Sequence, residues 1–289
     1  MKKSALPYRF LTAGLLGMLL ISCNTKHRIW VGKKGDQKIF NLKYGDHKKQ
    51  VMDLFLPAEY TPDTPVAMIV HGGAWKYGRK EHMIMIQNFL HQNNIPTVNI
   101  DYRHASKRRK ITYKEQLQDI ALACAKFNSL ASKAKLLPNN FVLLGESAGA
   151  HLALLYGYNN PDHIKKIISM SGPTDFYSNS YLQSAHSWYS KPTIQTMVGE
   201  KYERKAVSEK FREASPVNQV SNVPTLIFQG DSDYLVNRKQ ALALDSVLTE
   251  KQIPHQLIFM KHTGHTPRFF SKYKRDSIIL PAILDWIKK

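Results

Sequence analysis

The sequence predicts an α/β domain built on a mostly parallel β-sheet. Short apolar runs alternate with longer segments whose apolar residues recur three and four positions apart, and this alternation is typical of strands separated by helices. The chain has 289 residues, of which 43% are hydrophobic, so it can bury a full core. Its 22% of charged and 10% of aromatic residues are ordinary values for a globular protein and argue against disorder.

Eight segments are predicted to be strands, because each is a short apolar run bounded by polar or turn-forming residues. In chain order they are residues 39–44, 51–56, 66–70, 97–101, 141–144, 164–170, 225–228 and 256–260. The turn Gly45-Asp46-His47 is short enough for a hairpin between the first two strands. The sheet is therefore expected to begin with antiparallel strands and to continue with parallel ones.

Five segments are predicted to be helices from their apolar periodicity: residues 80–92, 113–134, 148–158, 238–251 and 269–287. Residues 175–214 interrupt the alternation. They are rich in Ser and Tyr, carry weak helical patterns around 191–198 and 205–212, and are interpreted as a small cap inserted over one end of the sheet. No internal repeat or low-complexity linker divides the chain, so residues 37–289 are predicted to form one domain.

The N-terminal segment is predicted to be a secretory signal. Lys2, Lys3 and Arg9 precede an apolar run over residues 10–21, which is too short to cross a bilayer as a helix. The run ends in Leu20-Ile21-Ser22-Cys23, which resembles the lipobox of bacterial lipoprotein precursors, where cleavage before a cysteine accompanies attachment of lipid to its sulfur. Residues 1–22 are thus expected to be the signal peptide.

Lipid on Cys23 implies a protein held at a membrane of the bacterial cell envelope, with the outer membrane or the cell surface as the expected location. Residues 23–36 are polar and are predicted to be a tether between the lipid and the domain. The alternative is an ordinary signal peptide whose cleavage site happens to contain a cysteine.

The chain is strongly basic, with 41 Lys and Arg against 22 Asp and Glu and a formal net charge of +19. The basic residues occur in small groups scattered along the chain: Lys33-Lys34, Lys48-Lys49, residues 107–110, Lys165-Lys166 and residues 272–275. They lack the interleaved aromatic residues and the motifs of nucleic-acid recognition, so no nucleic-acid partner is expected. A solvated surface is the first interpretation, and attraction to anionic lipid or acidic glycan is the second.

The two cysteines exclude a disulfide framework and a four-thiolate zinc site. Cys124 lies at helical spacing with Ile120 and near Phe127, so it is expected to pack as a small apolar residue. The pair His262 and His265 has no third ligand at metal-binding spacing. Neither a metal nor another cofactor is therefore expected.

A candidate nucleophile lies between a predicted strand and a predicted helix. Strand 141–144 runs directly into the motif Gly145-Glu146-Ser147-Ala148-Gly149, after which the helix continues. A nucleophilic serine needs a sharp turn that exposes its hydroxyl, and the flanking glycines leave room for the neighbouring strand and helix. The bare Gly-x-Ser-x-Gly pattern is weak, but its strand-to-helix context predicts a nucleophile elbow at Ser147.

A serine hydroxyl needs a base to remove its proton, and the base needs a carboxylate to orient it. Two carboxylates, Asp231 and Asp233, follow strand 225–228, and two imidazoles, His262 and His265, follow strand 256–260. The order Ser, Asp, His along the chain is the one expected for this type of elbow. Their spacing does not choose between the two members of either pair.

Backbone donors for an oxyanion are also predicted. Strand 66–70 runs into His71-Gly72-Gly73-Ala74-Trp75, a turn of mostly small residues whose N–H groups can point at a developing negative charge. The N–H of Ala148, directly after the serine, is a further donor. Acyl chemistry requires such donors, so this turn supports the assignment of Ser147.

With these motifs, the chain resembles the α/β-hydrolase superfamily over about residues 37–289. The likeness is to carboxylesterases with a His-Gly-Gly oxyanion segment, namely hormone-sensitive-lipase-like acetyl esterases, feruloyl- and acetylxylan-esterase-like proteins and relatives of kynurenine formamidase. Further landmarks in the family's order are Gly78, Asp101-Tyr102-Arg103, Asp119, Ser215-Pro216 and Gly230-x-x-Asp233. The continuation Tyr102-Arg103-His104-Ala105 departs from the Leu-Ala-Pro-Glu of the lipase-like branch.

The resemblance implies an α/β-hydrolase fold and a serine hydrolase that cleaves small carboxylic esters, acetyl or aromatic acyl, through an acyl-enzyme. The residues it assigns are the nucleophile Ser147, the orienting acid Asp233, the general base His265 and the oxyanion-hole donors Gly73, Ala74 and Ala148. The family places the acid three residues after the glycine, which disfavours Asp231. It places the base after a glycine just before the last helix, which disfavours His262.

Amide hydrolysis by the same residues is the main alternative, because the motifs do not identify the leaving group. A binding protein that has lost catalysis is a second alternative, against which the intact serine, acid and base argue. The expected partner is a small ester substrate, and acylated glycan fragments are a hypothesis from analogy; the oligomeric state is left open.

Other residues near these motifs are expected to have supporting roles. His71 is expected to shape its turn, and Glu146, Asp101 and Asp119 are expected to be structural hydrogen-bond or ion-pair partners. The aromatic residues predicted as candidates to line an acyl or sugar pocket are Trp75, Tyr77, Tyr181, Trp188 and Tyr189.

Overall fold

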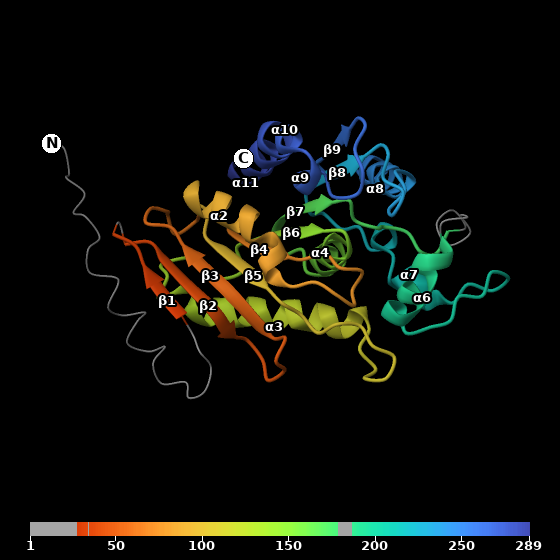
Figure 1. The fold of residues 1–289 in the computed structure, drawn as a ribbon, viewed down its shortest axis with the longest axis horizontal. Helices are drawn as coiled ribbons and strands as arrows, with labels where there is room; N and C mark the ends of the chain where they lie inside the picture. Colours follow the sequence, from red (N-terminus) through yellow and green to blue (C-terminus); the bar gives the residue numbers. More distant parts are fainter. Residues whose placement is uncertain (1–27, 34, 179–186) are drawn as a thin grey trace.

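The computed structural model describes residues 28–33, 35–178 and 187–289. Within them, nine strands form one sheet with the order β1-β2-β3-β5-β4-β6-β7-β8-β9 (Figure 1). The bounds of the strands are β1 Arg28–Val31, β2 Gln37–Lys43, β3 Val51–Leu56, β4 Val66–Val70, β5 Thr97–Ile100, β6 Phe141–Glu146, β7 Ile164–Met170, β8 Thr225–Gly230 and β9 His255–Met260.

The sheet is mostly parallel, as predicted. β1, β2, β3 and β5 pair antiparallel in succession, and every pairing from β5 through β4, β6, β7 and β8 to β9 is parallel. The β2–β3 hairpin expected at Gly45 is confirmed. Because the central strands run in the same direction, their carboxyl ends meet at one edge of the sheet.

Helices cover both faces of the sheet. The helical segments are η1 Lys80–Met83, α2 Ile84–Gln92, α3 Tyr113–Ala131, α4 Ala148–Asn159, α6 Ser187–Val198, α7 Glu209–Glu213, η2 Pro216–Asn218, α8 Lys239–Glu250, α9 Pro267–Phe270, α10 Lys272–Lys274, η3 Arg275–Ile279 and α11 Leu280–Lys288. In Figure 1, α3 and α4 lie on one face, and α2 and α11 lie on the other. α6 and α7, in the predicted insertion 175–214, lie beyond the end of the sheet.

The central strands are apolar throughout because both of their faces are covered. In β4, Val66, Met68 and Val70 pack into the core on the side of α3 and α4, whereas Ala67 and Ile69 pack into the core on the side of α2 and α11. Such uninterrupted apolar runs made the central strands easy to predict.

The sheet has one strand more than the eight predicted. β1 falls within residues 23–36, which the sequence analysis interprets as a tether, so the sheet begins at Arg28. β1 is an edge strand of four residues that pairs with β2, and its side chains are mostly exposed. With Trp30 half exposed, the strand carries no alternation of buried and exposed residues that the sequence could have revealed.

The single helix predicted over residues 269–287 is wrong. The chain there forms α9, α10, the widened turn η3 and α11 in succession. Ser271, with extended backbone angles, separates α9 from α10. The i→i+5 turn of η3 precedes Pro281, which lacks an N–H and whose ring crowds the carbonyl of the preceding turn.

Two local predictions can be checked directly. Cys124 is a buried free thiol in the core, as expected, and burial raises its pKa to about 12. Cys23 lies outside the described residues. Among the residues that are described, no helix is both long and apolar enough to cross a membrane.

Candidate active site

Ser147 lies at the sharp turn between β6 and α4. Its backbone angles are φ 53° and ψ −121°, a conformation that is costly for a residue other than glycine and is characteristic of nucleophile elbows. The flanking glycines are required sterically. A Cβ on Gly145 would lie 2.3 Å from the carbonyl oxygen of Gly149, and a Cβ on Gly149 would lie 2.2 Å from that of Val70.

The structure brings Ser147, His265 and Asp233 together in one hydrogen-bonded chain. His265 Nε2 lies 2.8 Å from Ser147 Oγ, and His265 Nδ1 lies 2.8 Å from Asp233 Oδ2. The carboxylate side chain is fully buried, and the imidazole is 13% exposed. Because a carboxylate accepts the Nδ1–H, Nε2 is left to accept the serine proton.

Asp233 is fixed by donors on both of its oxygens. Its Oδ1 accepts the backbone N–H groups of Leu235 and Val236 at 3.0 and 2.9 Å. Its Oδ2 accepts the side-chain amide of Gln229, at 3.2 Å, in addition to His265. Gln229 is a buried polar residue within β8, and the sequence analysis missed its role.

The competing acid and base are directed elsewhere. Asp231 is partly exposed and accepts the hydroxyl of Ser232 and the N–H of Thr263. His262 is exposed, with φ 51°, and its carbonyl oxygen accepts a hydrogen bond from Lys274. Within the two pairs, the described contacts therefore join Asp233 and His265 to Ser147, and not Asp231 or His262.

The oxyanion loop, residues 71–79, lies against the elbow. Gly73, Ala74 and Trp75 all have positive φ, at 124°, 48° and 58°. A Cβ on Gly72 would lie 2.9 Å from the carbonyl oxygen of Glu146 and 3.3 Å from Ser147 Cβ, so this loop can approach the serine only with glycine at that position.

The N–H groups of Gly73 and Ala74 donate to no other group within the described part of the chain. The loop is closed instead by the carbonyl of Gly73, which accepts the N–H groups of Lys76 and Tyr77 at 3.1 and 2.8 Å. The N–H groups of Gly73, Ala74 and Ala148, the last directly after Ser147, are the predicted donors to an oxyanion and are called the oxyanion donors.

A buried histidine that the sequence analysis missed connects this loop to two other elements. His151, on α4, accepts the indole N–H of Trp75 at Nδ1 (3.0 Å) and, at Nε2, contacts the carbonyl oxygen of Ala214 (2.8 Å). Burial lowers the pKa of His151 to about 4, so the ring is neutral at neutral pH and its Nε2–H donates to Ala214. Trp75 is therefore a buried residue held by a hydrogen bond to His151.

His71 and Asp101 support the start of the oxyanion loop. The His71 ring is buried, contacts the carbonyl oxygen of Gly72 through Nδ1 at 2.7 Å and stacks on Tyr102 with ring centroids 4.3 Å apart. Burial lowers the pKa of His71 to about 3, which fits the expected role in shaping the turn. Asp101 accepts the backbone N–H of Lys80 at 2.8 Å.

Two carboxylates near the elbow form ion pairs, as expected of structural residues. Asp119 is buried and binds Arg103 through several hydrogen bonds of 2.7 to 3.1 Å. Glu146, which precedes the serine, binds the buried Arg268 at 2.6 and 2.8 Å. Arg268 lies three residues after His265, so this pair joins the elbow to the loop that carries the imidazole.

The aromatic residues predicted as pocket candidates are described only in part. Tyr77 is 66% exposed at the tip of the oxyanion loop. Tyr181 lies outside the described residues, as do the side chains of Trp188 and Tyr189.

The comparison with protein families identifies the chain. A model of the BD-FAE family matches residues 52–248, which include the oxyanion loop, Ser147 and Asp233. The chain belongs to the BD-FAE family. The nine-stranded, mostly parallel sheet, together with esterases among the relatives and the similar solved structures, confirms the expected α/β-hydrolase fold and the likeness to esterases.

Curated relatives of this BD-FAE protein include two enzymes of different chemistry. It is 24% identical to an isoprenylcysteine α-carbonyl methylesterase of Arabidopsis thaliana, over 79% of this chain and 56% of that protein. It is 27% identical to a kynurenine formamidase of Danio rerio, over 41% of this chain and 38% of that protein. The chain spans about half the length of the methylesterases it matches.

Among solved structures, the BD-FAE protein is similar to one described as a truncated form of a carbohydrate esterase from gut microbiota. The TM-score is 0.71 at 20% sequence identity, with 87% of this chain and 95% of that chain covered. This agreement of fold extends across nearly the whole described domain.

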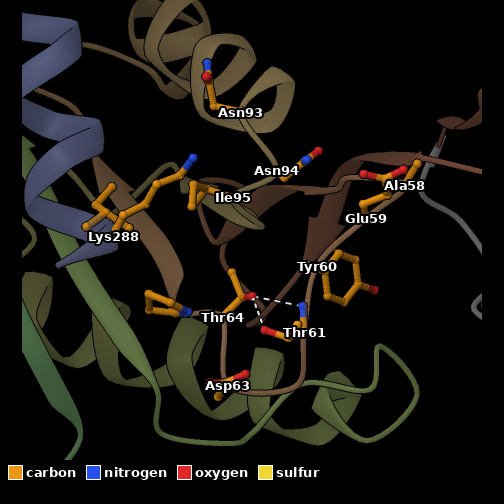
Figure 2. A pocket seen from close by; sticks show the side chains of 12 residues that line it. Ala58, Glu59, Tyr60, Thr61, Asp63, Thr64, Asn93, Asn94, Ile95 and Lys288 are labelled. Atoms are coloured by element: carbon orange, nitrogen blue, oxygen red, sulfur yellow. Dashed lines mark hydrogen bonds between the residues drawn. The ribbon is translucent and has the colours of Figure 1, made fainter. Parts of the chain in front are cut away.

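A groove of about 630 Å³ opens at the opposite edge of the sheet (Figure 2). Its lining residues are Ala58, Glu59, Tyr60, Thr61, Asp63, Thr64, Pro65, Asn93, Asn94, Ile95, Ile287 and Lys288. The hydroxyls of Thr61 and Thr64 bond to each other at 2.9 Å. The lining includes no imidazole or thiol.

Proposed function

We propose that this protein is a serine hydrolase that cleaves small carboxylic esters through an acyl-enzyme. The observation that carries the proposal is the chain of hydrogen bonds from Asp233 through His265 to Ser147, with 2.8 Å at each step. A serine hydroxyl becomes a useful nucleophile when a base in this position accepts its proton.

The geometry supports a two-step reaction. Ser147 Oγ attacks the ester carbonyl carbon while its proton passes to His265 Nε2, and Asp233 stabilises the resulting imidazolium. The oxyanion donors hold the negative charge of the tetrahedral intermediate. The alcohol leaves with the proton from the imidazolium, and a water molecule then releases the acid and restores the serine hydroxyl.

Acetyl or aromatic acyl groups on saccharides are the proposed substrates. The support is the likeness to a solved structure described as a carbohydrate esterase, together with the exposed ring of Tyr77 beside the site, because sugar rings stack on such aromatic side chains. Amide hydrolysis is the second candidate. It is favoured by the shorter match to a kynurenine formamidase, which covers 41% of this chain.

The test is the initial rate of hydrolysis of chromogenic acetate, butyrate, octanoate and feruloyl esters, with N-formylkynurenine as the amide. We expect turnover of a short or aromatic ester that falls by at least about 10⁴-fold in Ser147→Ala, because only the nucleophile is removed. Ser232→Ala is the matched control, since its hydroxyl is exposed and bonds only to Asp231 among the described residues.

Equal turnover by Ser147→Ala and wild type would overturn the assignment of the nucleophile. Faster turnover of the amide than of every ester would show that amide hydrolysis, the second candidate, is the activity of this protein. A folded protein that hydrolyses none of these compounds and is not labelled by a fluorophosphonate would support a binding function instead.

A lipid on Cys23 and a location in the bacterial cell envelope belong to the same proposal. They rest on the apolar run and the cysteine of the N-terminal segment. A Cys23→Ser variant that still pelleted with the membranes would contradict them.

A further inference from the structure

Basic groups that are scattered in the sequence gather at the carboxyl edge of the sheet. Three loops at this edge, residues 44–50, 71–79 and 101–112, follow β2, β4 and β5. Figure 1 shows the turn between β2 and β3 and the loop before α3 projecting to the same side of the sheet. The catalytic candidates lie at the same edge, because Ser147 follows β6.

Several cations on these loops have no ion pair with a carboxylate within the described part of the chain. They are Lys48, Lys76, Lys107, Arg108, Arg109 and Lys110, together called the basic rim. By contrast, Arg103 is paired with Asp119, and Lys49 lies 3.9 Å from Asp101. The basic rim is therefore available to an anionic ligand.

The run 107–110 is presented by a closed loop. Ser106 and Ile111 exchange backbone hydrogen bonds of 2.9 and 3.0 Å across its base. Lys110 has φ 53°, which completes the turn. All four side chains of the run are exposed, and the closed base holds them in a small space.

This basic loop is attached directly to the oxyanion loop. The N–H of Ala105 donates to the carbonyl of Trp75 at 2.8 Å. The side-chain amide of Gln116 donates to the same carbonyl at 2.9 Å and to the carbonyl of Arg103 at 2.8 Å. A ligand that bridges the basic rim and the oxyanion loop would thus meet elements fixed to one another.

These loops contain two carboxylates against the six cations of the basic rim. Asp101 is buried and lies 3.9 Å from Lys49, and Asp46 is exposed. Burial lowers the pKa of His47, and the charge of Arg103 lowers it further. The pKa of His104 is likewise lowered, first by burial and then by the charge of Lys49.

The composition of the basic rim favours a saccharide chain over a lipid surface. Within the described part of the chain, loops 44–50 and 101–112 carry no exposed large apolar side chain, and loop 71–79 carries one, Tyr77. Surfaces that dock on bilayers insert several such side chains between the lipids. A single exposed aromatic ring suits stacking on a sugar ring instead.

We propose that the basic rim binds the carboxylate or sulfate groups of an anionic saccharide chain, whose ester is then presented to Ser147. The inference rests on the proposed esterase function and specifies its substrate class. Charges at the border of a site act mainly on capture of the ligand, so they lower KM and leave kcat unchanged.

The experiment compares acetylated oligogalacturonate with acetylated xylo-oligosaccharide as substrates of the full chain. We expect kcat/KM for the anionic substrate to fall about tenfold between 20 and 500 mM NaCl, because salt screens exposed charges, and the value for the neutral substrate to stay constant. Arg108→Gln with Arg109→Gln should raise KM for the anionic substrate about threefold to tenfold at low salt.

The matched control removes two cations from the opposite edge. Lys165→Gln with Lys288→Gln makes the same change in net charge, because it also removes two cations. Both side chains are exposed and lie near the amino ends of the strands, away from the basic rim. This variant should keep the wild-type KM. An equal loss in the control would mean that net charge, and not the basic rim, attracts the substrate.

Binding to Ser147→Ala separates this inference from the esterase proposal. De-esterified polygalacturonate and chondroitin sulfate, which carry carboxylate alone and carboxylate with sulfate, should bind this variant in low salt and lose affinity in the Arg108→Gln, Arg109→Gln background. The inference would be overturned if the protein bound phosphatidylglycerol vesicles more tightly than either polymer. It would also be overturned if the affinity for the polymers were unchanged by the two substitutions, even with ester hydrolysis established.

Discussion

The two edges of the same sheet differ in the chemistry of their side chains. At the carboxyl edge, β6, β8 and β9 end in the loops that carry Ser147, Asp233 and His265. At the amino edge, a groove of about 630 Å³ is lined by amides, hydroxyls and a few charges, without an imidazole or a thiol. Figure 2 shows Lys288 extending from α11 into this groove.

The charges differ in the same way. The basic rim surrounds one side of the carboxyl edge. The loops at the amino edge carry both signs, with Glu59, Asp63 and Asp162 against Lys133, Lys135 and Lys251. The convergence of parallel strand ends therefore indicates the candidate site better than the presence of a groove does.

The largest expected effect separates two acids at the carboxyl edge. Asp233→Asn should lower kcat about 10⁴-fold, because an amide cannot hold the His265 tautomer that accepts the serine proton. Asp231→Asn should leave kcat within about threefold, since its contacts are to Ser232 and Thr263. Steady-state kinetics on the best chromogenic ester measures both, and the reverse ranking would exchange the two assignments.

The next effect concerns the buried ion pair beneath the elbow. Arg268→Met should lower the free energy of unfolding by about 3–5 kcal/mol, because it leaves the Glu146 carboxylate buried without its partner. Lys114→Met is the control at an exposed pair, with Glu213, and should cost at most about 1 kcal/mol. Urea denaturation gives both values, and equal losses would show that the Glu146 pair is not effectively buried.

A smaller effect depends on pH. The pKa of His151 is about 4 in the folded state against an ordinary value of 6.5, so between these values the unfolded state binds a proton that the folded state excludes. The contribution of His151 to the free energy of unfolding should therefore be fully present above pH 6.5 and should decline as the pH falls towards 4.

Replacing His151 isolates its share of this decline. In His151→Gln the slope of unfolding free energy against pH should be smaller by up to about 1.4 kcal/mol per pH unit. The remaining slope should include His71, whose pKa is also depressed by burial. An unchanged slope, measured by denaturation at pH 7 and 4.5, would show that the His151 ring is protonated in the folded protein.

The smallest effect compares matched tyrosines at the two edges. The hydroxyl of Tyr102 donates to the carbonyl of His71 at 2.9 Å, and that of Tyr60 donates to the carbonyl of Ala134 at 2.8 Å. Each Tyr→Phe change should cost about 1 kcal/mol of stability. Only Tyr102→Phe should also lower kcat, by several-fold, because it loosens the oxyanion loop; a similar loss in Tyr60→Phe would link the groove to catalysis.

Much of the fold could be predicted because strands buried on both faces have uninterrupted apolar sequences. The eight predicted strands are all present, with ends shifted by a residue or two. β1 was missed because four mostly exposed residues leave no pattern. The break near residue 271 was missed because the apolar periodicity of a helix continues through a widened turn.

The sequence predicts those parts of the site in which a motif fixes the backbone. The glycines around Ser147, for example, are required sterically by the turn. Its supports were not predicted. His151 and Arg268 pair with segments far along the chain. Gln229 contacts Asp233 only four residues away, but through a turn whose geometry the sequence does not display. Nothing in the local sequence distinguishes such a residue from an ordinary buried polar one.

Because the sheet already begins at Arg28, few residues separate Cys23 from the domain, and this limits how far the domain could lie from a membrane. A fully extended chain advances about 3.5 Å per residue, so a lipid on Cys23 would lie at most about 17 Å from β1. If the domain began only at residue 37, as the predicted tether 23–36 implies, the distance could be about 50 Å. An anchored domain of this kind could not extend far from its membrane. Polymers would have to be drawn to the bilayer surface before their esters could be cleaved.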